Sequence, residues 1–114
     1  TPLQSFVTLN DEAYIEFAQA LAHRIYAEGG ESTADRLEFA LRLTLAKPVD
    51  ANRLAALTDL FDGELAEYRK TPNAAKELFG KTVPVPNGAT LPEMAALTVV
   101  ANVLLNLDAI LMKG

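Results

Sequence analysis

The 114-residue sequence contains no cysteine and only one histidine, His23, and these shortages exclude several kinds of site at once. Without thiolates there is no disulfide, no cysteine-ligated zinc centre, no iron–sulfur cluster and no covalently attached c-type haem. A single imidazole excludes every site that needs two, and a lone histidine points to no chemical partner. We therefore interpret His23 as a partly exposed helical residue and expect no catalytic residue, cofactor or metal ligand within the chain.

Positive charge is also scarce. The formal net charge is −5, and the Lys and Arg residues are scattered singly apart from Arg69 and Lys70. An averaged field of this sign repels phosphate backbones. Basic runs interleaved with aromatics, glycine-rich phosphate-binding motifs and nucleophile elbows are all missing from the sequence. The sequence thus predicts neither a nucleic-acid partner nor a recognisable active site of its own.

Strand-like alternation of useful length is absent too, whereas helical periodicity runs through most of the chain. Helix breakers such as Gly29-Gly30 and Pro48 separate apolar segments of helical spacing. The expected helices are residues 11–28, 32–46, 51–70, 72–79 and 90–112. Half of the residues are hydrophobic, so a packed core is expected. The patterns predict one all-α domain over residues 1–114, a compact bundle of four to five helices around a central hydrophobic C-terminal helix.

The first of these helices has an apolar stripe that we expect to face the core. Tyr14, Phe17, Leu21 and Ile25 recur at the helical spacings i, i+3, i+7 and i+11, and the stripe is widened by Ile15, Ala18 and Ala22. Such a stripe predicts an inner face of this helix that includes Tyr14 and Phe17.

The closing helix is apolar around nearly its whole circumference, as expected of a helix surrounded by others. Asn102, Asn106 and Asp108 interrupt it, and an Asp near the centre of a bilayer costs about 3 kcal/mol, so we expect no membrane span. Thr98, Asn102 and Asn106 recur every four residues and form a narrow polar line. This line either faces solvent, satisfies backbone groups across a helix contact, or forms a docking seam of exposed asparagines for another part of a larger protein.

Carboxylates gather within residues 51–70, where they form a possible acidic face. Its members are Asp59, Asp62, Glu64 and Glu67. A solvated helix face is the ordinary interpretation, and calcium binding is disfavoured because the alternating ligand spacing is missing. If carboxylates instead converged on a pocket with His23 or Tyr68, they could serve acid–base chemistry of the glycosidase kind. The face could also dock a basic cytochrome surface, in which case binding would weaken with salt.

Three stretches of the sequence resemble a known family. They are residues 3–11 (LQSFVTLND), 36–48 (RLEFALRLTLAKP) and 104–108 (LLNLD). Together they are similar to the C-terminal region of planctomycete-type secreted proteins that combine cytochrome-c-like domains with domains of unknown function. The middle motif of that family usually reads Leu-Gly-Arg-x-Pro followed by a Glu, whereas this chain has Ala46, Lys47 and Arg53. No Arg–Glu pairing at that turn is therefore carried over.

The resemblance implies a C-terminal fragment of a large secreted or periplasmic protein whose haem-binding motifs lie outside these residues. It supplies no established activity and no catalytic residue. The leading hypothesis is a noncatalytic helical module that packs against other domains of the parent protein. The alternatives are a wall of a composite, polysaccharide-related enzyme site shared with upstream domains, and an acidic docking domain for a cytochrome-c-like domain.

Overall fold

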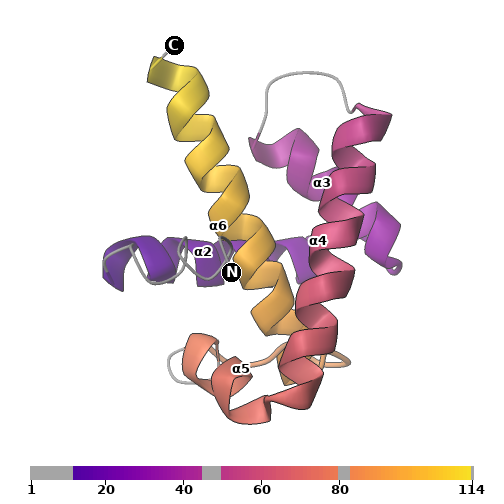
Figure 1. Cartoon of the computed structure of the whole chain (residues 1–114), viewed down its shortest axis with the longest axis vertical. Coiled ribbons are helices and arrows are strands. Elements are labelled where there is room, and N and C mark those ends of the chain that lie inside the picture. The colour runs from indigo at the N-terminus through magenta and orange to yellow at the C-terminus, as the bar shows by residue number, and fades with distance from the viewer. Residues whose placement is uncertain (1–11, 45–49, 80–82, 114) are drawn as a thin grey trace.

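The closing helix forms the centre of the molecule. The computed structural model describes residues 12–44, 50–79 and 83–113, and the side chains of residues 15–44, 50–79 and 83–106. Helix α6 (Leu91–Lys113) contacts each of the other described helices (Figure 1). The radius of gyration is 13.0 Å, close to the roughly 13 Å expected for a compact domain of this length. The prediction of a compact all-α bundle around its C-terminal helix is confirmed.

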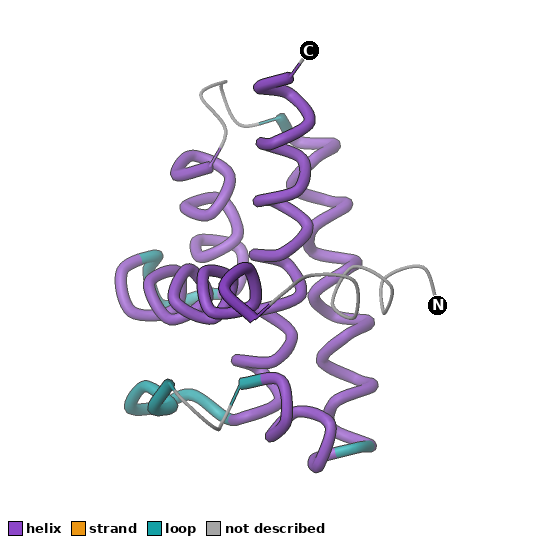
Figure 2. Tube along the Cα trace, turned by 90° about the vertical axis from the view of Figure 1, so that its left-hand side faces the viewer, coloured by secondary structure: helices purple, strands orange, loops and turns teal. Residues whose placement is uncertain are grey.

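Four helices of the described part of the chain surround α6. They are α2 (Glu12–Glu28), α3 (Thr33–Thr44), α4 (Ala51–Lys70) and α5 (Pro72–Leu78). α4 runs beside α6, α2 crosses α6 steeply, and α5 closes one end of the bundle (Figure 1). In the view turned by 90°, α2 is foreshortened while α4 and α6 are both seen from the side (Figure 2). The described residues contain no strand, as the sequence predicts.

The helix starts follow local capping chemistry. Asp50 caps α4 by accepting a hydrogen bond from a backbone N–H of its first turn. Before α6, Thr90 N donates to Glu93 Oε1 at 2.9 Å and Glu93 N donates to Thr90 Oγ1 at 3.3 Å, which is the expected capping box. At α3, Ser32 Oγ accepts from Asp35 N at 3.1 Å. These contacts explain why the sequence predicts the starts of the helices to within about two residues.

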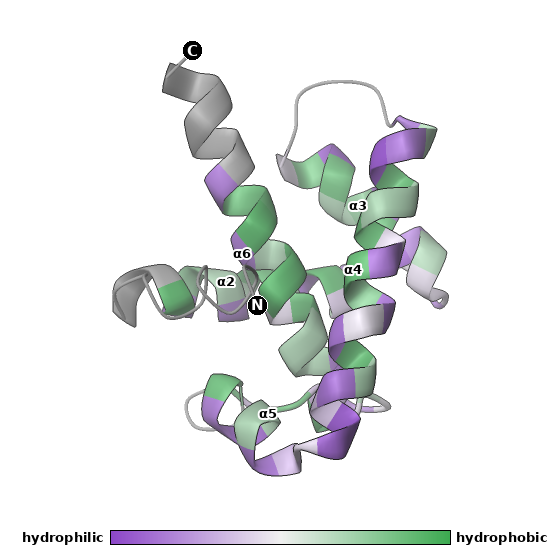
Figure 3. Ribbon diagram, in the orientation of Figure 1, coloured by the Kyte–Doolittle hydropathy of each residue, from purple (hydrophilic) through white to green (hydrophobic). Residues whose placement is uncertain are grey.

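The hydrophobic core lies around the middle of α6. Every residue from 94 to 102 is at most 2% exposed. This stretch of α6 is predominantly hydrophobic (Figure 3). Its two polar residues are Thr98 and Asn102. Buried side chains from the surrounding helices complete the main cluster: Ala22, Ile25, Leu37, Ala40, Leu41, Leu57 and Phe61. Removal of this apolar surface from water is the main force that holds the helices together.

The inner face of α2 differs from the expected stripe. Phe17 is 68% exposed, whereas Ala18 and Ala22 are at most 1% exposed and Ile25 is fully buried. Small side chains on this face allow the α2 backbone to approach α6 closely where the two helices cross. The prediction that Phe17 faces the core is therefore wrong, because close helix packing favours alanine at the crossing. Tyr14, in the same stripe, lies outside the residues whose side chains are described.

Among the described residues, no helix combines the length and hydrophobicity that a membrane span requires. The expectation of no span therefore holds for this part of the chain. Residues 45 and 46, which the sequence places at the end of the second helix, lie outside the described residues, as does the family-like stretch at residues 3–11.

Candidate functional site

An open groove lies between α2, α3 and α6, and we refer to it as the α2/α3/α6 groove. It has a volume of about 440 Å³. Its lining consists of Phe17, Ala20, Leu21, Arg24, Leu43, Thr44 and Leu105. Phe17 and Leu43 are among the large hydrophobic side chains that the structure leaves exposed, at 68% and 36%. Exposed apolar side chains that share one concave surface are typical of a protein-binding site.

Each lining residue is placed there by the packing of its own helix. Because Ala18 and Ala22 turn toward α6, the residues next to them in sequence, Phe17 and Leu21, are rotated onto the flank of α2. Likewise, Ala40 and Leu41 of α3 are buried, which leaves the following turn at the edge of the groove. The hydroxyl of Thr44 donates to Ala40 O at 2.8 Å, so it is already paired within α3.

Arg24 is the charged residue of the described groove lining. Its Nε lies 3.4 Å from Glu28 Oε1, one turn further along α2. The two side chains are 53% and 57% exposed, and exposed pairs of this kind are worth at most about 1 kcal/mol. Arg24 can therefore exchange this partner for another carboxylate at little cost.

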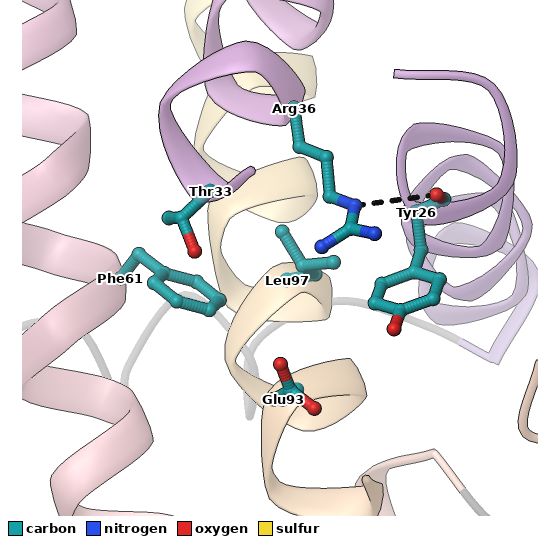
Figure 4. A pocket seen from close by; sticks show the side chains of 6 residues that line it. All are labelled: Tyr26, Thr33, Arg36, Phe61, Glu93 and Leu97. Atoms are coloured by element: carbon teal, nitrogen blue, oxygen red, sulfur yellow. Dashed lines mark hydrogen bonds between the residues drawn. The ribbon is translucent and has the colours of Figure 1, made fainter. Parts of the chain in front are cut away.

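A second, much smaller cavity lies between α2, α3, α4 and α6 (Figure 4). Its volume is about 10 Å³, and its lining includes Tyr26, Arg36, Glu93 and Leu97. The Arg36 guanidinium lies 3.8 Å from the centre of the Tyr26 ring, and its Nε donates to Tyr26 O at 3.3 Å. This cation–π contact links α2 to α3 across the turn that joins them. The cavity is too small for a substrate, so we assign this cluster a structural role.

The predicted docking seam is mostly buried. Thr98 is 1% exposed and its hydroxyl donates to Met94 O at 2.7 Å. Asn102 is 2% exposed, and Asn106, which is half-buried, donates from Nδ2 to Asn102 O at 2.8 Å and to Asn102 Oδ1 at 3.2 Å. The solvent-facing and docking-seam alternatives both need an exposed Asn102, and they do not hold at this residue because α6 is surrounded at this depth. Within the predicted seam, the accessible amide is that of Asn106.

The predicted acidic face of α4 is partly exposed. Asp59, Asp62 and Glu67 are exposed, whereas Glu64 is half-buried. Burial, reinforced by repulsion from Glu67, raises the pKa of Glu64 above its ordinary value. Burial and the neighbouring Glu64 raise the pKa of Tyr68 to about 12. Within the described part of the chain, no group of three metal-binding side chains comes together.

The composite enzyme hypothesis required two carboxylates near His23 or Tyr68 in one pocket. Neither of the two cavities described above contains such a group: the smaller is lined by one carboxylate, Glu93, and the larger by none of its described residues. His23 is half-buried on α2 and lines neither cavity. These two cavities therefore give no support to this alternative.

Sequence reasoning missed the groove because it assigned Phe17 to the core. The alanines at 18 and 22, which the sequence places in the same stripe as Phe17, lie one helical turn apart and suit a close helix crossing, and this spacing was a signal for the correct face. The fold and the site thus define a helical bundle that carries an open, largely apolar groove lined by described residues of α2, α3 and α6. No family model, no curated protein and no solved structure matches the chain.

Proposed function

We propose that the chain is a noncatalytic helical interaction module that docks another domain of a larger protein in the α2/α3/α6 groove. The observation that carries this proposal is the exposure of Phe17, at 68%, on the wall of an apolar groove. Full burial of one such side chain contributes about 1.5–3 kcal/mol. A protein segment seated in the groove gains this contribution, and aromatic anchors of this kind often dominate binding.

The openness of the groove favours a protein segment over a small molecule. Sites for small ligands usually enclose most of the ligand surface, and they place a few convergent polar groups around it. Here the described lining offers Arg24 and the hydroxyl of Thr44, which is already bonded to its own helix. A site with so few directing groups selects by shape and hydrophobicity, as the core of a domain interface does.

The family resemblance supports the choice of partner. It implies a large secreted or periplasmic protein in which this region follows other domains, some of them cytochrome-c-like. We propose that one of these domains supplies the segment that covers Phe17. Contacts between domains of one polypeptide bury surface of this kind in many multidomain proteins.

Photo-crosslinking in the complete polypeptide tests the proposal. A photoreactive phenylalanine analogue replaces Phe17, and a matched control places the same analogue at Ala66, an exposed position on α4. We expect position 17 to form adducts with residues outside 1–114, mapped by mass spectrometry, while position 66 does not. Adducts confined to residues 1–114, or the same pattern from both positions, would overturn the proposal.

A cytochrome-docking role has one observation in its favour. Asp59, Asp62 and Glu67 are exposed on α4, and none forms an ion pair with another described residue. Such a face would attract a basic protein surface. The affinity for a basic c-type cytochrome should then fall steeply between low and physiological salt, and it should also fall in a triple Asn/Gln variant of these residues. Binding that does not respond to salt would exclude this second role.

A further inference from the structure

The groove also indicates what kind of segment it receives. We infer that the α2/α3/α6 groove accepts an amphipathic helix whose apolar face buries Phe17 and Leu43 and whose flank presents a carboxylate to Arg24. This inference rests on the proposed function, because it specifies the chemistry of the segment that docks there.

The secondary structure of the occupant follows from backbone hydrogen bonding. An extended peptide in an apolar groove needs partners for its N–H and C=O groups, and it usually finds them by adding to the edge of a sheet. The described residues contain no strand, and the α2 and α6 walls of the groove are helix interiors whose backbone groups are bonded internally. A helix satisfies its own backbone groups, so it is the form that can lie between α2, α3 and α6 without loss of hydrogen bonds.

The carboxylate follows from charge complementarity. Among its described lining residues, the groove contains one cation, Arg24, and no anion. Arg24 reaches Glu28 only through Nε, and the Nη atoms have no described partner. A guanidinium binds a carboxylate best through two nitrogens at once, and removal of the site from water strengthens the contact. A helix with a lysine at that position would instead be repelled.

Selection from a displayed peptide library tests the inference with the chain as it stands. The library encodes helices of about 15 residues with fixed apolar positions on one face and randomised flanks. Baits are the wild-type chain, Phe17→Asp, Arg24→Glu and Arg24→Lys. Both substituted residues are exposed, so circular dichroism should show unchanged folding. We expect the wild type to select helices with Asp or Glu at one flanking position, and we expect Arg24→Glu to select Lys or Arg there.

The outcomes separate the two proposals. An individual acidic peptide should lose about tenfold in affinity against Arg24→Glu and much less against Arg24→Lys. If no helical peptide binds the wild type better than Phe17→Asp, this inference fails, while crosslinking from position 17 in the complete polypeptide still decides the docking function. If peptides bind in a Phe17-dependent manner, but show no acidic preference and no reversal with Arg24→Glu, the docking function stands and the inference about their charge is overturned.

Discussion

At the scale of single residues, the ionised carboxylate of Glu64 destabilises the folded protein, and this effect on stability can be measured. Its pKa in the folded protein is raised, so the folded state holds the proton more tightly than the unfolded state does. Stability is therefore lost as the pH rises from below the ordinary value of 4.5 through the raised pKa. We expect Glu64→Gln to raise the melting temperature by about 2 °C at about pH 7, because the side chain is only half-buried.

A measurement of Glu64→Gln at low pH serves as the control for this prediction. At about pH 3 the carboxyl is protonated in both states, so the melting temperatures of Glu64→Gln and wild type should converge. Asp62→Asn, which changes an exposed carboxylate on the same helix, should show a smaller difference at both pH values. A Glu64→Gln effect that is equal at both pH values would show that the ionised carboxylate is not its cause.

Among the described side chains of α6, Asn102 has the amide that is buried. Its Oδ1 accepts from Asn106, and its surroundings are nearly free of water at 2% exposure. We expect Asn102→Leu to change the free energy of unfolding by less than about 1 kcal/mol, since the lost amide is replaced by apolar surface. Asn102→Asp should cost more than about 2 kcal/mol at neutral pH, because it places a charge in the core.

Urea denaturation measures both variants. Asn73→Asp is a matched control, because it makes the same chemical change at an exposed position in the first turn of α5, where a negative charge is tolerated. Equal costs for Asn102→Asp and Asn73→Asp would contradict the burial of Asn102. They would also restore the interpretation of Asn102 as part of an exposed docking seam.

At the scale of helices, two glycines should respond in opposite ways to alanine. Gly63 lies inside α4, and a Cβ built on it has no neighbouring atom within 4 Å. Gly30 has φ +118°, and a Cβ there would approach the Cβ of Asp35 to 2.9 Å. We expect Gly63→Ala to stabilise the protein by about 0.5–1 kcal/mol and Gly30→Ala to destabilise it by about 1–3 kcal/mol.

Thermal unfolding followed by circular dichroism compares the two variants directly. Since both gain the same methyl group, the comparison isolates backbone conformation from hydrophobicity. A loss of stability in Gly63→Ala would mean that α4 is bent or contacted at this position. An unchanged Gly30→Ala would mean that the turn between α2 and α3 does not need a positive φ.

Helix existence and helix starts could be predicted from the sequence, because capping residues and prolines act locally. The orientation of α2 could not be predicted in the same way. Both Phe17 and Ala18 fit helical stripes of similar spacing, and only the closeness of α6 decides which stripe turns inward. The groove forms only because Phe17 faces outward, so helical periodicity alone could not predict it. The burial of Asn102 likewise depends on neighbours that are distant in sequence.

At the scale of the whole molecule, stability should depend on α6 far more than on the rim of the groove. Leu97 is 1% exposed and belongs to the main core cluster, whereas Leu43 is 36% exposed. We expect Leu97→Ala to cost about 2–5 kcal/mol, a large share of the 5–15 kcal/mol typical of a domain. Leu43→Ala makes the same truncation and should cost less than about 1 kcal/mol.

Guanidinium denaturation followed by circular dichroism measures this difference. Leu43→Ala should nevertheless weaken the binding of helical peptides to the groove, which separates a binding role from a folding role. Similar losses of stability in the two variants would indicate that the edge of α3 is packed as tightly as the centre of α6.

The position of α6 also has a consequence for synthesis of the protein. The helix that every other described helix contacts is the last of them to be translated. Until residues 94–104 have left the ribosome, α2 through α5 lack the surface that buries their apolar faces. The nascent chain therefore exposes these faces to chaperones throughout elongation, and native packing follows only after α6 emerges. A ribosome stalled before Leu91 should hold a protease-sensitive chain, and one stalled well beyond Lys113 should hold a resistant one.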